Sequence, residues 1–184
     1  MKQTKRQIKF LERKEVEKLI NAIPRDGYRN LRDRALLEVL FSTGMRIHEA
    51  LELPEAPFVS EKNRTMEMSI VGKGDWQRVI FFSPKALEAI KNYLIVKNDE
   101  ELELFPITSR CAQLMIKRRA KLAGIEKRVS PHILRHSLAT DLLMRGVDVR
   151  VVQEFLGHRS ISSTQVYTHV TNAQLKDIHK KLYK

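Results

Sequence analysis

A short stretch near residue 132 combines several features of a phosphate-binding site. His132 and Arg135 are three residues apart, so they share one face of a helix. Ser130 and Pro131, just before them, are typical of a helix start. The first turn of a helix carries free N–H groups and a positive dipole that favour phosphate. Arginine adds a planar fork of donors for phosphate oxygens, and histidine can move a proton near neutral pH.

Four residues elsewhere in the sequence could complete such a site. Arg46 comes just after a glycine turn, Lys73 lies between two glycines where it can swing, and His158 follows a Leu-Gly pair. Tyr167 follows His158 at a short distance along the chain. A lysine can donate a proton to a leaving alkoxide, and a tyrosine becomes a nucleophile once its proton is removed. Each of these residues alone is more commonly structural, so the combination carries the interpretation.

Together the six residues indicate one class of reaction. Two arginines and a lysine supply positive charge at a phosphoryl group, and Tyr167 supplies a nucleophile for an enzyme-bound intermediate. No cluster of carboxylates suitable for Mg²⁺ accompanies them in the sequence. We therefore expect phosphoryl transfer that needs no metal and no cofactor.

The composition favours a nucleic-acid partner. The 184 residues include 34 Lys and Arg against 22 Asp and Glu, a formal net charge of +12. A polyanion is the expected partner of such a chain, although a basic surface that only contacts water stays open. The single cysteine, Cys111, excludes an internal disulfide and a zinc site built from several cysteines. The sequence contains neither a membrane-spanning apolar stretch nor the apolar core of a signal peptide, so we expect a cytoplasmic protein.

The elements that must position these residues are mostly helical. Periodicity and helix-stop residues predict helices over about residues 11–23, 31–42, 46–53, 84–97, 109–123, 131–145, 148–156, 160–168 and 172–182. Alternating residues at 66–70 and 78–82, separated by a glycine-rich turn, predict an antiparallel hairpin with a short extra strand near 58–60. The expected fold class is therefore mainly α with a small antiparallel β-sheet, an α+β arrangement.

The length and the charge pattern indicate one domain with a short lead-in. Residues 1–10 carry four basic side chains and no acidic one, so we expect a linker there and a single domain over residues 11–184. Six apolar residues at helical spacing are predicted to be core, namely Leu142, Leu143, Val151, Val152, Phe155 and Leu156. A chain of this length can bury such a core without disulfides.

Five short motifs occur in order along the chain, and they read TGMRIHEAL, GKG, HILRHSLAT, LGH and TQVYTHV. A single motif of this size occurs by chance in many proteins, whereas all five in register are specific. In these motifs the sequence resembles the catalytic domain of the tyrosine recombinases, the phage-integrase family, over about residues 8–183. One departure concerns the hairpin, where Asp75 and Trp76 stand in place of a basic residue that the family usually has, so the match of Lys73 is looser.

The resemblance implies that three cationic residues act on a DNA phosphate. Arg46 and Arg135 would clamp the scissile phosphate and stabilise the charge of its transition state. Lys73 would be the general acid that protonates the leaving 5′-oxygen. Glu49, one helix turn after Arg46, is expected to orient that arginine or to be its buried partner.

The resemblance also implies the roles of the other three residues. His132 would accept or orient the proton of the nucleophile, and His158 would hydrogen-bond a non-bridging phosphate oxygen. Tyr167 would attack the phosphate and form a 3′-phosphotyrosyl link. All six family positions carry the expected residue types, which speaks against an inactive relative.

The function that the resemblance implies is that of a site-specific DNA recombinase or integrase, which cleaves and rejoins DNA strands. The expected partners are double-stranded DNA, further copies of the chain in a tetramer that passes through a Holliday junction, and accessory DNA-bending proteins. Family members usually carry an additional N-terminal domain, so the chain is expected as an excised catalytic domain or a naturally short member. Two alternatives stay open, a type IB topoisomerase-like enzyme that relaxes DNA and a DNA-binding module without catalysis.

Two surface features have more than one interpretation. The basic run at Lys117, Arg118, Arg119 and Lys121 is either a face for the DNA backbone or an ordinary solvated face. The C-terminal segment, residues 172–182, carries an apolar stripe that must be covered by something. It can fold back on its own domain or dock on an adjacent subunit, and the resemblance favours the adjacent subunit.

Overall fold

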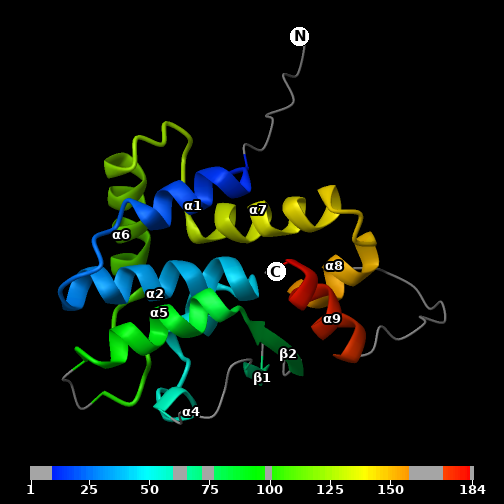
Figure 1. Ribbon diagram of the computed structural model, residues 1–184, viewed down its shortest axis with the longest axis horizontal. Helices are drawn as coiled ribbons and strands as arrows, with labels where there is room; N and C mark the ends of the chain where they lie inside the picture. The colour runs from blue at the N-terminus through cyan, green and yellow to red at the C-terminus, as the bar shows by residue number, and fades with distance from the viewer. Residues whose placement is uncertain (1–9, 60–65, 72–76, 98–100, 158–171, 183–184) are drawn as a thin grey trace.

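The computed structural model describes residues 10–59, 66–71, 77–97, 101–157 and 172–182. Its helices are α1 (Arg13–Asn21), α2 (Tyr28–Thr43), α3 (Ile47–Leu51), α4 (Ala56–Val59), α5 (Pro84–Leu94), α6 (Ser109–Leu122), α7 (Pro131–Met144), α8 (Val149–Leu156) and α9 (Asn172–Leu182). Figure 1 shows a mainly helical molecule with one small hairpin, so the predicted fold class is confirmed. The helix predicted over residues 160–168 lies outside the described residues.

The predicted hairpin is confirmed. Strand β1 (Met66–Val71) pairs antiparallel with β2 (Gln77–Phe82) along the full length of both strands. In Figure 1 the hairpin lies beside α9 and below α2 and α5. The predicted extra strand near residues 58–60 is wrong, because residues 56–59 form the helical turn α4. Pro57 explains the difference, since proline lacks the N–H of a strand ladder and suits the first turn of a helix.

Side-chain caps explain where three of the helices begin. Ser83, Thr108 and Ser130 each accept a hydrogen bond from the backbone N–H three residues further on, at the starts of α5, α6 and α7. Pro84 and Pro131 stand in the first turn of α5 and α7, where a missing N–H leaves no hydrogen bond unmade. The helix that carries the histidine and arginine of the third motif therefore begins where the sequence predicts.

The core gathers around α2, which crosses the molecule between α1 and α5 (Figure 1). α2 packs against α1, α5, α7 and β2, and its side chains Leu36, Leu37 and Val39 are fully buried. Complete burial of a side chain of this size contributes roughly 1.5–3 kcal/mol to the free energy of unfolding. The well-packed α2 therefore gives a rigid base to the segment that follows its C-terminal end and carries Arg46.

Most of the apolar residues predicted as core in α7 and α8 are buried, namely Leu142, Val152, Phe155 and Leu156. Val151 is half-buried and packs against the core. The prediction for Leu143 is wrong, because this side chain is 44% exposed. Successive residues of a helix point about 100° apart. Near the end of α7 Leu142 takes the inward position, and its neighbour faces outward.

The C-terminal helix α9 packs against its own domain, next to β2 (Figure 1). Leu182 and His179 of α9 are buried. The centre of the His179 ring lies 5.8 Å from the ring of Phe81 and 6.2 Å from the ring of Phe155. In the single chain the helix therefore folds back on its own domain.

Candidate active site

Arg46 is placed by an abrupt helix end. Gly44 caps α2 with a φ of 63°, in the left-handed region that favours glycine, and its N–H donates to the carbonyl oxygen of Leu40 at 3.1 Å. The chain then turns, and Arg46 stands in extended conformation at the position just before α3. The Thr-Gly pair of the first motif thus ends one helix and sets the direction of the next. Arg46 lies where the two meet.

Arg135 connects three helices. It lies on the second turn of α7 and is only 6% exposed. Its Nη1 donates to the carbonyl oxygen of Gly44, and its Nη2 donates to the carbonyl oxygen of Leu156 at 2.5 Å. These carbonyls belong to the C-terminal ends of α2 and α8, where the helix dipole is negative. The guanidinium of Arg135 is therefore held in one orientation.

Glu49 is the buried carboxylate on which the arginines converge. It accepts hydrogen bonds from the backbone N–H of Arg46 at 2.7 Å and from Nη1 of Arg46 at 3.0 Å. It also accepts from Nη1 and Nη2 of Arg78, at 3.0 and 2.6 Å. Burial raises the pKa of Glu49, but the hydrogen bonds from Arg78 and Arg46 outweigh it and lower the pKa to about 2. The prediction that Glu49 is a buried partner of Arg46 is confirmed.

Sequence reasoning missed Arg78, the second arginine on Glu49. Arg78 lies on β2, yet its side chain is only 8% exposed. A signal for it was available, because residues two apart on a strand share a face. Ile80 and Phe82, on the same face as Arg78, are apolar and buried. An arginine in line with two core residues needs a buried anionic partner, and Glu49 is that partner.

The cluster is strongly positive although much of it is buried. Arg46, Arg78 and Arg135 surround Glu49, which leaves a net charge of 3 − 1 = +2. Burial, together with repulsion from Arg46 and Arg78, lowers the pKa of Arg135 to about 10, so it stays charged at neutral pH. The Arg46 side chain is 35% exposed and is the part of the cluster that solvent reaches. An anion that binds at Arg46 would meet uncompensated positive charge.

His132 lies on the first turn of α7, one helix turn before Arg135. Its side chain is exposed, whereas Arg135, three residues further on, is buried. The two residues therefore differ in access to solvent. An exposed histidine at this end of the helix can exchange protons with solvent or with a bound group.

The other three candidate residues, Lys73, His158 and Tyr167, lie outside the described residues. The segments next to two of them end at the arginine cluster. β2 carries Arg78 and follows the part of the sequence that contains Lys73. α8 ends at Leu156, whose carbonyl oxygen accepts from Arg135, two residues before His158. Of the six candidates, the structure brings together Arg46 and Arg135, and it places His132 one helix turn before Arg135 on α7.

The basic run on α6 is divided between two roles. Arg119 turns inward and donates from Nε and Nη2 to Asp33 of α2, at 3.0 and 2.7 Å, so it joins two helices. Lys117, Arg118 and Lys121 are exposed. A groove of about 720 Å³ beside α6 has a basic lining that includes Arg110, Lys117, Lys121, Lys127 and Arg128. The interpretation as a DNA-backbone face therefore applies to the exposed part of the run alone.

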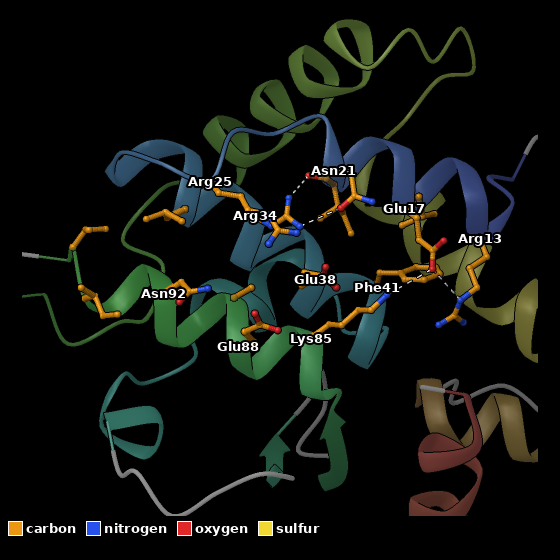
Figure 2. A pocket seen from close by; sticks show the side chains of 16 residues that line it. Arg13, Glu17, Asn21, Arg25, Arg34, Glu38, Phe41, Lys85, Glu88 and Asn92 are labelled. Carbon is orange, nitrogen blue, oxygen red and sulfur yellow. Dashed lines mark hydrogen bonds and ion pairs between the residues drawn. The ribbon is translucent and has the colours of Figure 1, made fainter. Parts of the chain in front are cut away.

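A separate groove of about 570 Å³ lies between α1, α2 and α5, and Figure 2 shows its lining. Nη1 of Arg34 donates to the carbonyl oxygen of Ile20 at 2.7 Å, and Nη2 donates to Oδ1 of Asn21 at 3.2 Å. Burial raises the pKa of Glu38, which also lines the groove. Arg34 thus holds the end of α1 on α2, and of the candidates that the structure describes, Arg46, His132 and Arg135, none lines this groove.

Among the described residues no group of three or more His, Cys, Asp or Glu is placed to hold a metal ion. Within those ranges no helix is long and apolar enough to cross a membrane.

Comparison with known sequences finds a family and relatives that match most of the chain. The model of the phage integrase family matches residues 9–174. Tyrosine recombinase XerD of Corynebacterium glutamicum is 42% identical over 178 residues, which cover 89% of this chain and 58% of the relative. The chain spans about three fifths of the length of the curated relatives that it matches, from 58% to 62% in the first three.

Solved structures support the fold. The crystal structure of XerA recombinase matches with a TM-score of 0.68 and 30% identity, over 96% of this chain and 65% of that one. The XerH site-specific recombinase, solved with its difH substrate before cleavage, matches with a TM-score of 0.70 and 30% identity, over 82% of this chain and 47% of that one. Both similarities extend over most of the chain.

Proposed function

The chain belongs to the phage integrase family, and from this premise we propose that it is the catalytic domain of a tyrosine recombinase. In this proposal residues 11–184 form the domain and residues 1–10 form a linker. The domain cleaves DNA strands at specific sites and rejoins them. The observation that carries the proposal is the arrangement of Arg46 and Arg135 beside the buried Glu49.

The arginine cluster suits the phosphodiester of DNA. A phosphodiester carries one negative charge, and the cluster offers a net charge of +2 from groups fixed by hydrogen bonds before any ligand arrives. Donors that are oriented in advance stabilise developing charge without a cost of reorganisation. In our proposal Arg46 and Arg135 bind the non-bridging oxygens, and His158 adds a further donor.

The remaining candidates supply the proton transfers and the nucleophile. The Tyr167 hydroxyl gives its proton to His132 as its oxygen attacks phosphorus. The bond from phosphorus to the 5′-oxygen breaks, and Lys73 protonates that oxygen. The product is a 3′-phosphotyrosyl link with a free 5′-hydroxyl. Rejoining reverses these steps with the 5′-hydroxyl of a second strand, so the phosphate-ester bond is conserved.

Assembly on DNA is the second part of the proposal. Strand exchange needs two duplexes and a Holliday-junction stage, so four copies of the protein would act together. The net charge of +12 and the basic groove beside α6 support double-stranded DNA as the partner. We place this activity in the cytoplasm, with accessory DNA-bending proteins as further partners.

Covalent capture from a pool of DNA sequences tests the proposal. Nicked duplexes with a randomised segment are incubated with the chain, and protein–DNA adducts that survive denaturation are isolated and sequenced. We expect adducts with a common sequence, and none with Tyr167→Phe, which keeps the ring but removes the attacking oxygen. DNA retained without any adduct would indicate a binding module. Relaxation of supercoiled plasmid by monomers would indicate the topoisomerase-like alternative.

A further inference from the structure

Arg78 is a buried charge that the six candidate residues do not account for. It is only 8% exposed, and its fork grips both carboxylate oxygens of Glu49 at 3.0 and 2.6 Å. Removing a guanidinium from water is costly, and a buried ion pair commonly adds little to stability compared with apolar residues of similar size. The pair is therefore better explained by what it holds in place than by the stability that it adds.

Glu49 divides its contacts between two arginines. Its Oε1 accepts from Nη1 of Arg46 and from Nη1 of Arg78, both at 3.0 Å. Its Oε2 accepts from the backbone N–H of Arg46 and from Nη2 of Arg78, at 2.7 and 2.6 Å. Arg78 thus fixes the plane of the carboxylate and takes up part of its charge. Without Arg78 the full charge of Glu49 would act on Arg46 and draw it inward.

We propose that Arg78 is a positioning residue for DNA strand cleavage, because it holds Glu49 and through Glu49 directs Arg46 toward the scissile phosphate. The inference rests on the function proposed above. Both Nη groups of Arg78 donate to Glu49, so we assign its effect to Glu49 and not to contact with DNA. Arg46, with a side chain that is 35% exposed, is the group that Glu49 directs to the phosphate, where it acts together with Arg135.

A second contact links Arg78 to the segment that leads to His158. Gly157 ends α8 with a φ of 66°. A Cβ atom at this position would lie 2.8 Å from Cδ and 3.3 Å from Nε of Arg78. The stem of Arg78 therefore packs directly on the backbone of Gly157. One side chain of the hairpin thus contacts both α3 and the end of α8, which carry two parts of the proposed site.

The charges around Glu49 predict how loss of Arg78 changes the pH dependence of cleavage. Arg46 and Arg78 bond to Glu49, and Arg135 of α7 interacts with it electrostatically. In Arg78→Met the burial that raises the pKa of Glu49 stays, while the strongest bond that lowers it is gone. The carboxyl then takes up a proton at higher pH than in the wild type, and a protonated Glu49 no longer orients Arg46.

The rate of single-turnover cleavage at saturating protein tests the proposal. The substrate is a suicide duplex with the sequence found by covalent capture, and the rate is measured from about pH 5 to pH 8. We expect Arg78→Met to cleave about 100-fold more slowly, the effect of a small misplacement of a catalytic group. On the acidic side of the profile, the cleavage rate of the variant should begin to fall at a higher pH than that of the wild type; this fall is the acid limb. Combining Arg78→Met with Glu49→Gln should remove this limb and be no slower than the slower single variant.

The chain offers a matched control in Arg119→Met. This change breaks a comparable two-point fork, from Arg119 to Asp33, outside the site. It should lower the melting temperature but leave the rate and pH profile of the folded enzyme unchanged. A similar loss of rate in Arg119→Met and Arg78→Met would mean that Arg78 is only structural and would overturn the inference.

Arg78→Lys keeps the test valid if Arg78→Met does not fold. Lysine retains the charge but lacks the fork, so we expect a folded enzyme about tenfold slower than the wild type. If Arg78→Lys cleaved at the wild-type rate with the wild-type pH profile, the inference would be overturned. Covalent adducts formed by the wild-type chain would still support the proposed function. Absence of adducts from the wild type would overturn the proposed function itself.

Discussion

Gly44 lies directly against Leu156, since a Cβ atom at residue 44 would stand 2.5 Å from Cδ2 of that leucine. Cδ2 of Leu138 would be 2.9 Å away. The end of α2 approaches α7 and α8 this closely only because residue 44 has no side chain. The carbonyl oxygen of Gly44 also accepts a hydrogen bond from Arg135. Helix packing and the orientation of the arginine therefore depend on the same glycine.

Gly44→Ala should destabilise the domain by roughly 2–4 kcal/mol, from the strain of a left-handed alanine and from overpacking against two leucines. The change in the free energy of unfolding is measured by urea denaturation. Gly146→Ala is the control, because Gly146 has a φ of 80° but no atom within 4 Å of the added Cβ. Equal losses in the two variants would contradict the close contact at Gly44.

Glu49 should make stability depend on pH below about pH 4.5. A glutamate with the ordinary pKa of 4.5 takes up a proton in the unfolded chain, while the folded protein holds the pKa of Glu49 at about 2. The stabilisation is complete above pH 4.5 and is lost as the pH falls to 2, by about 3 kcal/mol in all. The stability difference between wild type and Glu49→Gln, measured by denaturation, should shrink over this range. A constant difference would contradict the assignment.

His179 should add a second pH dependence in a higher range. Burial lowers the pKa of His179 to about 4 from an ordinary value of 6.5. The unfolded chain therefore binds a proton that the folded protein does not, and stability should fall by about 3 kcal/mol from pH 6.5 to pH 4. His179→Phe keeps a ring beside Phe81 and Phe155 but cannot titrate. In this variant melting temperatures should vary less with pH, and an unchanged pH dependence would exclude His179 as its source.

Removal of metal ions should leave strand cleavage intact. Charge neutralisation at the phosphate is assigned to Arg46, Arg135 and Lys73, so the proposed reaction needs no ion. Covalent adducts on the captured duplex should form at the same rate in excess EDTA as in buffer with Mg²⁺. Loss of cleavage in EDTA, restored by added Mg²⁺, would point to a nuclease-like site and would contradict the mechanism.

The sequence predicted the arrangement of helices and hairpin well, because that information is local. Caps such as Ser130 and the alternation of residues in the hairpin act within a few positions of the chain. The strand predicted near residues 58–60 failed, because Pro57 favours a helical turn there. Leu143 failed because periodicity alone does not show which of two adjacent leucines faces the core.

The site was predictable where a motif marks it and unpredictable where contacts are long-range. Arg46 and Arg135 belong to motifs, and Glu49 lies one helix turn from Arg46. The bond from Arg78 to Glu49 joins residues 29 positions apart on different elements. The inward turn of Arg119 toward Asp33 spans 86 positions. Local patterns cannot specify such pairs. A charged residue on the same strand face as core residues, such as Arg78, predicts only that an oppositely charged partner exists.

The two bonds from Arg135 to the carbonyl oxygens of Gly44 and Leu156 also bear on how this chain could change over evolution. The same side chain joins three helices and is proposed to bind the phosphate. A descendant that abandoned strand cleavage but kept its fold would be free to lose Tyr167, yet it would still be selected to keep Arg135. The presence of this arginine in a relative therefore indicates that the fold is kept. The presence of the tyrosine indicates whether strand cleavage is kept.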